Sequence, residues 1–167
     1  SIQFSVFIRY HWIGKIPSNI IIRDENTRAL FKQHDKLLCA VNPVSLAANK
    51  AAYESGKSWL DQLKTYLDGN FEYVADYLGK NIPEAVFEIP EATYLAWVDM
   101  RALGFSGAQL RDFCANEANL ALNMGDWFGI GGSGFTRWNI ALPRARLAAL
   151  LERFAAAVLK HIEGRQT

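Results

Sequence analysis

The residues best suited to chemistry are Arg137 and Asn139, which alternate with Trp138 and Ile140 in a short run of mixed polarity. Alternate residues of a β-strand share a face, so Trp138 and Ile140 would face a core while Arg137 and Asn139 face a cleft or solvent. A planar guanidinium held on a strand is well suited to bidentate capture of a carboxylate. The spacing therefore indicates a carboxylate anchor at Arg137, with a solvated surface arginine as the alternative.

The glycine-rich segment GIGGSG at residues 129–134 matches the G-x-G-x-x-G string of dinucleotide-binding loops. Such a loop needs a strand before it and a helix after it, so that the phosphate meets a helix N-terminus. Residues 136–140 alternate like a strand instead, and the acidic residue at a comparable distance, Glu152, falls inside an expected helix. We therefore interpret this segment as a turn between two strands.

Cysteines and histidines show no spacing that is typical of a reactive or metal-binding site. Cys39 and Cys114 stand alone, which favours a reducing compartment such as the cytoplasm, with each thiol buried as a small hydrophobe. The ligand spacings of zinc sites are missing among His11, His34 and His161. We expect no metal in this chain.

The composition is that of a neutral chain able to form a core. Of its 167 residues 50% are apolar and 21% charged, with a net charge of +1. This balance excludes a disordered chain and argues against a sequence-independent nucleic-acid binder, which needs a basic surplus. No apolar run reaches the roughly 18 residues of a membrane helix, so we expect neither nucleic acid nor a membrane as partner.

The first half of the chain predicts one strand and then helices. A β-branched run at 18–23 indicates a buried strand, and Asp24 can cap a helix that carries Leu30, Phe31 and His34. After the break at Pro43, Ser45 can cap a long helical region whose apolar period continues to residue 78. An interruption at Gly69 leaves two alternatives, one long bent helix or two abutting helices.

The second half predicts an open-faced α+β sandwich. Its strands are expected at 86–89, 93–99, 120–123 and 136–140, with Tyr94 and Trp97 as core aromatics. Ser106 and Gln109 have the spacing of a capping box that opens a helix, and a last helix is expected from Pro143 to Gly164. The strand at 18–23 has no partner before residue 86, which suggests that part of its sheet is missing from the chain.

Six longer segments resemble, over their whole length, the sequences of a known protein family. They are NPVSLAA (42–48), AAYESGKSWLDQL (51–63), YLDGN (66–70), TYLAWVDMRALG (93–104), GDWFG (125–129) and GGSGFTRWNIALPR (131–144). Together they resemble the pyridoxal-phosphate (PLP) enzymes of the class I/II aminotransferase family, and most of all the MalY/PatB-type cystathionine β-lyases. The resemblance runs collinearly from about Ile16 to about Phe154.

The resemblance implies an α/β PLP-transferase fold of type I, present only in part. Residues 1–68 would be the end of the large cofactor domain and residues 69–167 the C-terminal α+β small domain, with the helical region 45–78 bridging the two. The intact enzyme would be a PLP-dependent homodimer about twice as long, acting on an amino-acid substrate. In the family the arginine of an R-x-N-x-A pattern binds the substrate α-carboxylate, and the matching residue is Arg137. Tyr94, Trp127 and Asn139 are expected to line the same site.

The first residues depart from the family pattern. The family's Schiff-base lysine lies in an S-K-x-F-N-(I/L)-A-G pattern, and aligning its glycine with Gly14 places Ile8 at the lysine position, with Lys15 on the wrong side. A PLP enzyme needs that lysine to hold the cofactor and move the proton. We therefore expect the fragment alone to be inactive and not to bind PLP.

Two functional interpretations follow from the resemblance and its departures. The first is the C-terminal part of a PLP-dependent C–S β-lyase or aminotransferase that acts on cystathionine or cysteine conjugates. The alternative is a non-catalytic or regulatory domain that keeps the aminotransferase fold. In either case the uncovered apolar surface of a truncated domain predicts self-association.

Overall fold

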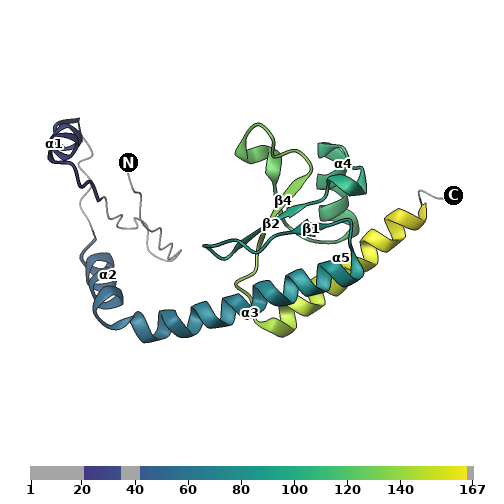
Figure 1. The fold of residues 1–167 in the computed structure, drawn as a ribbon, viewed down its shortest axis with the longest axis horizontal. Helices are drawn as coiled ribbons and strands as arrows, with labels where there is room; N and C mark the ends of the chain where they lie inside the picture. The colour runs from purple at the N-terminus through teal and green to yellow at the C-terminus, as the bar shows by residue number, and fades with distance from the viewer. Residues whose placement is uncertain (1–20, 35–41, 165–167) are drawn as a thin grey trace. The chain divides into compact units, whose positions relative to one another are not determined.

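The computed structural model describes residues 21–34 and 42–164 (Figure 1). The chain divides into two compact units, Ser1–Asp61 and Gln62–Thr167. The helix α3, Lys57–Asn81, begins in the first unit and continues into the second. The two units are described separately below.

The first described element is the helix α1, Glu25–His34. Its start is set by Asp24, whose Oδ2 accepts a hydrogen bond of 2.6 Å from the Thr27 backbone N–H. A carboxylate at this position satisfies a backbone donor that the helix leaves open and interacts favourably with the helix dipole. The predicted helix after Asp24 is confirmed.

The strand predicted at 18–23 is not found where the structure describes it. Residues 18–20 lie outside the described residues, and residues 21–23 carry no regular secondary structure. A strand needs a hydrogen-bonded partner, and the described residues of the first unit form helices only. The apolar pattern at 21–23 is therefore not sufficient to form a strand there.

The long helical region is broken at Gly56 rather than at Gly69. The helix α2, Pro43–Ser55, is capped by Asn42, whose Oδ1 accepts from the Val44 N–H at 2.9 Å, with the proline at its first position. The predicted cap at Ser45 is therefore wrong, because Asn42 already fills that role. A Cβ at Gly56 would lie 2.4 Å from the Ala52 carbonyl oxygen, so the glycine permits the tight turn into α3, which runs unbroken through Gly69.

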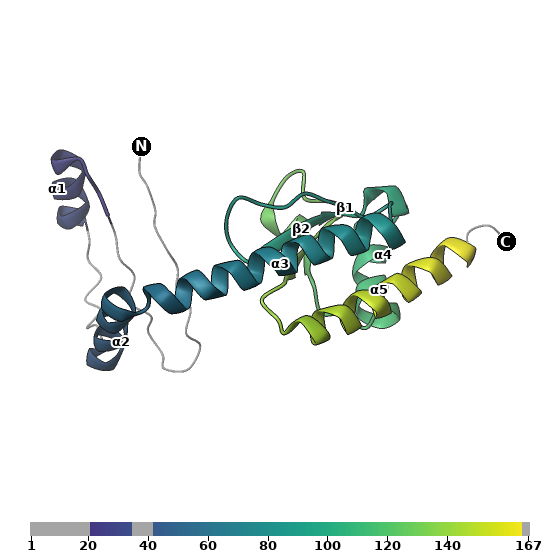
Figure 2. The same ribbon diagram turned by 60° about the horizontal axis from the view of Figure 1, so that its bottom comes forward.

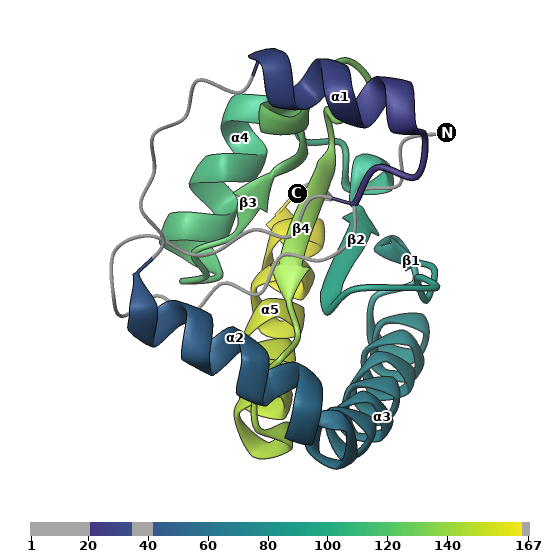
Figure 3. The ribbon, with the colours of Figure 1, turned by 90° about the vertical axis from the view of Figure 1, so that its left-hand side faces the viewer.

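The second unit contains a four-stranded antiparallel sheet in the order β1-β2-β4-β3. Figure 3 shows the strands in this order, with α5 passing behind them. The strands are β1, Val86–Phe87; β2, Leu95–Asp99; β3, Asn123–Met124; and β4, Phe135–Asn139. The predicted hairpin-like pair before residue 100 is present as β1 and β2, and β4 is confirmed with its start one residue earlier.

The third strand is later and shorter than predicted. The expectation for 120–123 is met only at Asn123, which pairs with Arg137. The backbone N–H of Leu120 donates instead to the Cys114 carbonyl at 2.7 Å, and Asn119 has a positive φ of 54°. The chain is therefore still completing the helix end at Leu120 and enters the sheet only three residues later.

Helices complete the second unit. The capping box predicted from Ser106 and Gln109 is present at the start of α4, Gly107–Asp112, with both reciprocal hydrogen bonds formed. The helix α4 passes into a π-helical turn, η2, Phe113–Glu117. The last helix, α5, Arg144–Gly164, begins one residue after the proline predicted to start it.

The core lies between one face of the sheet and the helices α3 and α5. Figures 1 and 2 show these two helices running side by side along that face. The sheet contributes Ala96, Val98 and Trp138, and the ring of Trp138 meets Phe154 of α5 edge to face at 5.0 Å. Because side chains alternate across a strand, the intervening residues Trp97 and Arg137 occupy the opposite face.

A buried amide ties α3 to the segment after β4. Asn70 is fully buried, and its Nδ2 donates to the carbonyls of Ile140 at 2.9 Å and Leu142 at 3.0 Å. Its Oδ1 accepts from Arg144 Nε at 2.8 Å. These bonds fix where the chain leaves β4, and so they help to fix the strand that carries Arg137.

Candidate functional site

The candidate site is built around Arg137 at the middle of β4. This strand lies inside the sheet, and Arg137 is paired with Trp97 on β2 and with Asn123 on β3. Its neighbours Thr136 and Trp138 are buried on the core face, whereas Arg137 is half-buried and Asn139 is exposed. The predicted alternation, with Arg137 and Asn139 turned away from the core, is confirmed.

The guanidinium of Arg137 is held from two directions. Its Nη2 donates to Asn123 Oδ1 at 3.0 Å, and its carbon lies 4.3 Å from the centroid of the Phe128 ring. Phe128 belongs to the short 3₁₀ helix η3, Gly125–Phe128. Arg137 Nε is buried and has no hydrogen-bond partner among the described residues. The group is thus oriented and keeps unused donors.

Three aromatic rings extend from Arg137 along this face of the sheet; we call Phe128, Trp97 and Phe135 the aromatic row. Trp97 meets Phe128 edge to face and stacks on Phe135, with 5.6 Å between centroids in each pair. At the far end, the Arg101 guanidinium lies 4.8 Å over the Phe135 ring. The row thus ends in an arginine at each side, which is favourable because a cation is attracted to a ring face.

Trp97 and Tyr94 are not core residues, contrary to the prediction. Trp97 lies on the face opposite the core and keeps 39% of its surface exposed. Tyr94 is 44% exposed and follows Thr93, whose φ of 77° turns the chain just before β2 begins. The prediction failed because apolar content alone does not say which of the two faces of a strand is covered.

The other predicted site-lining residues lie around Arg137 without holding it. Trp127 is exposed in η3, next to Phe128. The side chain of Asn139 accepts from the backbone N–H of Ala141 at 3.0 Å. Among the described residues, neither these two nor Tyr94 makes a hydrogen bond or ring contact with Arg137. Their role as lining residues stays a prediction.

The glycine-rich segment forms the turn that was predicted, and it shapes the site. It connects η3 to β4, so a strand follows it and the requirement of a nucleotide loop is not met. A Cβ on Gly132 would lie 2.0 Å from the Gly125 carbonyl oxygen, and one on Gly125 would lie 2.1 Å from the Gly132 oxygen. Only glycines permit this approach of two backbones, which places Phe128 against Arg137.

An ion pair lies at the other end of the aromatic row. Asp99 accepts from Arg101 through both carboxylate oxygens, at 2.9 Å from Nε and 2.7 Å from Nη2. The side-chain hydrogen bond from Arg101, with the backbone bond and the positive charge of the same residue, lowers the pKa of Asp99 below its usual value. Arg101 is therefore engaged, which leaves Arg137 as the arginine of this face with donors to offer.

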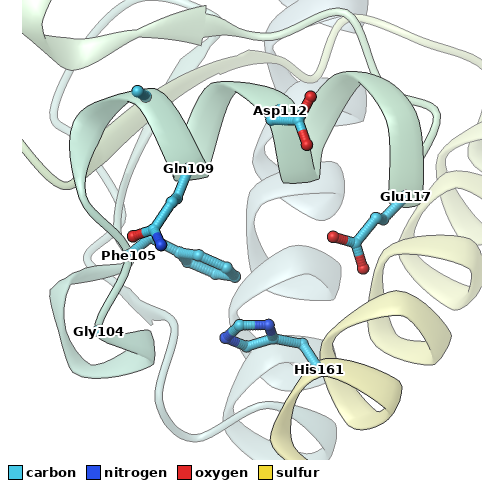
Figure 4. A pocket seen from close by; sticks show the side chains of 7 residues that line it. Gly104, Phe105, Gln109, Asp112, Glu117 and His161 are labelled. Carbon is cyan, nitrogen blue, oxygen red and sulfur yellow. The ribbon is translucent and has the colours of Figure 1, made fainter. Parts of the chain in front are cut away.

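Other reactive groups lie apart from this face. A hollow of about 540 Å³ is lined by residues of the α4 region and by His161 of α5 (Figure 4), where the His161 ring lies 4.1 Å from Phe105. Burial raises the pKa of the Cys114 thiol to about 12. Within 21–34 and 42–164, no cluster of metal-ligating side chains occurs, and no helix is long and apolar enough to cross a membrane.

The described residues do not offer a lysine suited to holding PLP. A Schiff-base lysine is activated by desolvation or by a neighbouring cation. All six described lysines are exposed and lie on helices, whereas Arg137 is on the sheet: Lys32, Lys50, Lys57, Lys64, Lys80 and Lys160. Ile8 at the family's lysine position, and Lys15, lie outside the described residues.

Asn123 and Phe128 are the site residues that the sequence did not single out. Asn123 reaches Arg137 through the pairing of β3 with β4, and the length of the loop between them gives no indication of that register. Phe128 is placed by the close contact of Gly125 with Gly132. The clustering of glycines around the aromatic pair Trp127 and Phe128 was the available signal, and it does not say which of the two contacts Arg137.

Curated proteins with similar sequences support the resemblance. No family model matches the chain. Protein MalY from Escherichia coli is 37% identical over 110 residues, covering 66% of this chain and 28% of its own length. Cystathionine β-lyase PatB from Bacillus subtilis is 35% identical over 147 residues, covering 87% and 38%. The chain thus spans between about a quarter and two fifths of the length of these relatives.

Solved structures agree with the sequence relatives. Cystalysin from Treponema denticola, which contains PLP, superposes with a TM-score of 0.79 at 31% identity, covering 86% of this chain and 37% of that one. A PLP-bound C–S lyase from Staphylococcus hominis gives 0.76 at 38% identity, covering 86% and 37%. The chain therefore belongs to the fold type I, PLP-dependent aminotransferase family, as a partial copy of the fold in the branch that contains MalY and PatB.

Proposed function

We propose that the chain supplies the substrate-carboxylate site of a PLP-dependent C–S β-lyase or aminotransferase in the cytoplasm. The substrates would be amino acids with a Cβ–S bond, such as cystathionine or cysteine conjugates. The names of the relatives support this substrate class, since they include cystathionine β-lyases and a C–S lyase. Within that reaction Arg137 binds the α-carboxylate.

The observation that carries the proposal is the state of the Arg137 guanidinium. It is half-buried on an inner strand, oriented by Asn123 and Phe128, and keeps donors without a protein acceptor. Pairing it with a carboxylate would add charge-assisted hydrogen bonds of about 1.5–3 kcal/mol each. A carboxylate held there would fix the amino acid at one end, which is what a positioning anchor must do.

PLP would supply the electron sink for the Cα carbanion when bound. The described residues provide no lysine for it, so we infer that this chain alone does not hold PLP covalently. The test is borohydride reduction of the purified chain with PLP, followed by peptide mass spectrometry. The expected result is no stoichiometric phosphopyridoxyl peptide; a stoichiometric adduct on Lys15 contradicts the inference.

The role of Arg137 is tested in a chimera of PatB whose matching segment is replaced by residues 16–154 of this chain. Arg137→Ala should lower kcat/KM for cystathionine at least about a hundredfold, because a charged pair worth about 3 kcal/mol is lost. The PLP absorbance of the chimera should stay unchanged. Arg153→Ala, which removes an exposed arginine of α5, is the control. Equal loss of PLP and activity in Arg137→Ala indicates a structural arginine.

A second candidate function is a non-catalytic or regulatory domain. Ile8 at the lysine position favours it, together with the exposure of all described lysines. The two candidates differ in what precedes the family-like part in the reading frame. An S-K-x-F-N pattern upstream indicates an enzyme, and a natural start close to Ser1 indicates the non-catalytic domain.

We also propose that the protein self-associates, as a homodimer in its intact form. Large apolar side chains are exposed on the described helices of the first unit, including Tyr53 at 63% and Trp59 at 61%. Exposed apolar surface of this kind is typical of an interaction site. Light scattering after size exclusion should show mass rising with concentration; a monomer at all concentrations contradicts the proposal.

A further inference from the structure

We propose that Asn123 and Phe128 are positioning residues that hold the Arg137 guanidinium in a carboxylate-binding orientation before a ligand arrives. The inference rests on the proposed function, because it concerns the same guanidinium. It assigns a role to two residues beside the anchor itself.

The two contacts restrict different motions of the guanidinium. The Phe128 ring, 4.3 Å from the guanidinium carbon, covers one face of the group and so restricts its tilt. The hydrogen bond from Nη2 to Asn123 Oδ1 restricts its rotation within that plane. The stem is already fixed because Arg137 lies on an inner strand. Together these contacts hold a flexible side chain in one orientation before any ligand arrives.

The remaining donors then define which N–H groups a ligand can bind. Nε is buried and Nη2 uses one of its hydrogens on Asn123. Nη1 makes no hydrogen bond and, unlike Nε, is not among the buried unpartnered atoms of the described residues. The donors left for a ligand are therefore those of Nη1 and the second Nη2 hydrogen. Two N–H groups of one guanidinium can bind the two oxygens of a carboxylate in parallel.

The neighbouring groups support this assignment. Phe128 is itself held by Trp97, at 5.6 Å and 76°, so the ring cannot simply turn away. Asn123 is an uncharged acceptor and leaves the positive charge of Arg137 available to an anion. Arg101, the other cation at the aromatic row, is bound by Asp99 through both carboxylate oxygens. Arg101 is thus already paired with a carboxylate, whereas Arg137 is oriented by the uncharged Asn123.

The experiment uses the full 167-residue chain labelled with ¹⁵N. The Nε–H signal of Arg137 is assigned by its loss in Arg137→Ala, and its hydrogen exchange is measured without ligand. Binding is then followed by titration with propionate. The variants are Asn123→Ala, Phe128→Leu and Phe128→Tyr, with Asn81→Ala as control, because Asn81 hydrogen-bonds only within α3, to the Tyr77 carbonyl.

The expected result has two parts. Asn123→Ala and Phe128→Leu should speed Nε–H exchange at least about tenfold and weaken propionate binding about tenfold, since a bond to a charged group is lost or its geometry loosened. Phe128→Tyr keeps the ring and should restore both values. Asn81→Ala should leave them unchanged.

Failure of the inference and failure of the proposed function give different results. If Arg137→Ala abolishes propionate binding while Asn123→Ala and Phe128→Leu keep wild-type exchange and affinity, the positioning role is overturned and the carboxylate site stands. If the wild-type chain shows no response to propionate, the proposed carboxylate site is contradicted. In that case the hydrogen exchange of the Arg137 Nε–H is the measurement that tests the positioning role. Backbone amide spectra identify any variant that fails to fold.

Discussion

At the scale of single residues, the face of the sheet opposite the core contains two arginines in different electrostatic states. Arg101 is neutralised by Asp99 at 2.7 Å, whereas Arg137 has only the neutral amide of Asn123 and the ring of Phe128. An oriented arginine that has no carboxylate partner in the protein is suited to bind the carboxylate of a ligand. The contrast explains why Arg137, and not Arg101, is the candidate anchor.

The lowered pKa of Asp99 predicts a pH-dependent contribution to stability. Its folded pKa lies below the ordinary value of 3.8, so the unfolded state binds its proton first as the pH falls. The contribution of Asp99 is therefore fully present at neutral pH and is lost as pH falls from about 4 through the folded pKa. Asp99→Asn should lower the urea midpoint at pH 7, and its difference from the wild type should shrink as the pH falls below about 4.

The control for this prediction is Asp76→Asn. Asp76 pairs with Lys80 on the exposed surface of α3, with the Asp76 side chain 59% exposed. Exposed pairs one helical turn apart contribute little, so this variant should behave like the wild type throughout this pH range. A constant destabilisation by Asp99→Asn from pH 7 to pH 2 is the result that contradicts the role of its charge.

The buried thiol of Cys114 should be chemically inert in the folded chain. Burial raises its pKa to about 12, so almost no thiolate is present at pH 8, and the thiolate is the nucleophile. In a Cys39→Ser variant, which leaves one thiol, reaction with a disulfide reagent should be at least roughly a hundredfold slower in buffer than in urea. Equal rates in the two solvents would show that Cys114 is accessible.

Periodicity predicted the orientation of Arg137 correctly, but it did not find the residues that hold the arginine. A two-residue period assigns each side chain of a strand to a face, and one buried neighbour, such as Trp138, fixes the assignment. The contact with Asn123 depends instead on the register between β3 and β4, and the contact with Phe128 depends on a close approach of two glycines. Both are long-range features that local spacing does not encode.

At the scale of elements, the helix boundaries show how capping decides between similar patterns. The apolar period runs across Gly56 and Gly69 alike, yet the helix breaks only at the first. The difference is steric, because a Cβ at Gly56 would meet the Ala52 carbonyl, whereas Gly69 faces the flexible end of Arg144. A sequence pattern reports that a glycine is present but not which backbone atoms surround it.

Two alanine substitutions should distinguish a glycine that the fold requires, Gly132, from one that the fold only tolerates, Gly79. A Cβ at Gly132 would lie 2.0 Å from the Gly125 oxygen, so Gly132→Ala should destabilise the chain by about 2 kcal/mol or more. Gly79, on exposed α3, has no atom within 4 Å of a Cβ. Gly79→Ala should therefore stabilise the chain by about 0.5–1 kcal/mol.

Urea denaturation measures the change in stability of both variants. The hydrogen exchange of the Arg137 Nε–H shows whether Gly132→Ala also affects the candidate site. Gly132→Ala should speed that exchange, because the loop no longer presses Phe128 against the guanidinium. Gly79→Ala should leave it unchanged. If Gly132→Ala is as stable as the wild type, the close approach of the two backbones does not contribute to the fold.

At the scale of the whole molecule, the buried core belongs to one of the two units. The buried apolar residues run from Leu67 to Val158, all within Gln62–Thr167. The helices α1 and α2 contain no buried residue. The chain covers 28% of the length of MalY and 38% of the length of PatB.

This division predicts that a fragment of residues 57–167, which keeps α3 intact, folds on its own. It should unfold in one cooperative urea transition with nearly the midpoint of the full chain, because it retains the whole described core. Residues 1–56 alone should show no cooperative transition, since their described helices bury no side chain among themselves and short isolated helices are marginal in water. Circular dichroism in urea measures both. A fragment 57–167 without a sigmoidal transition would mean that the first unit is required for the fold that presents Arg137.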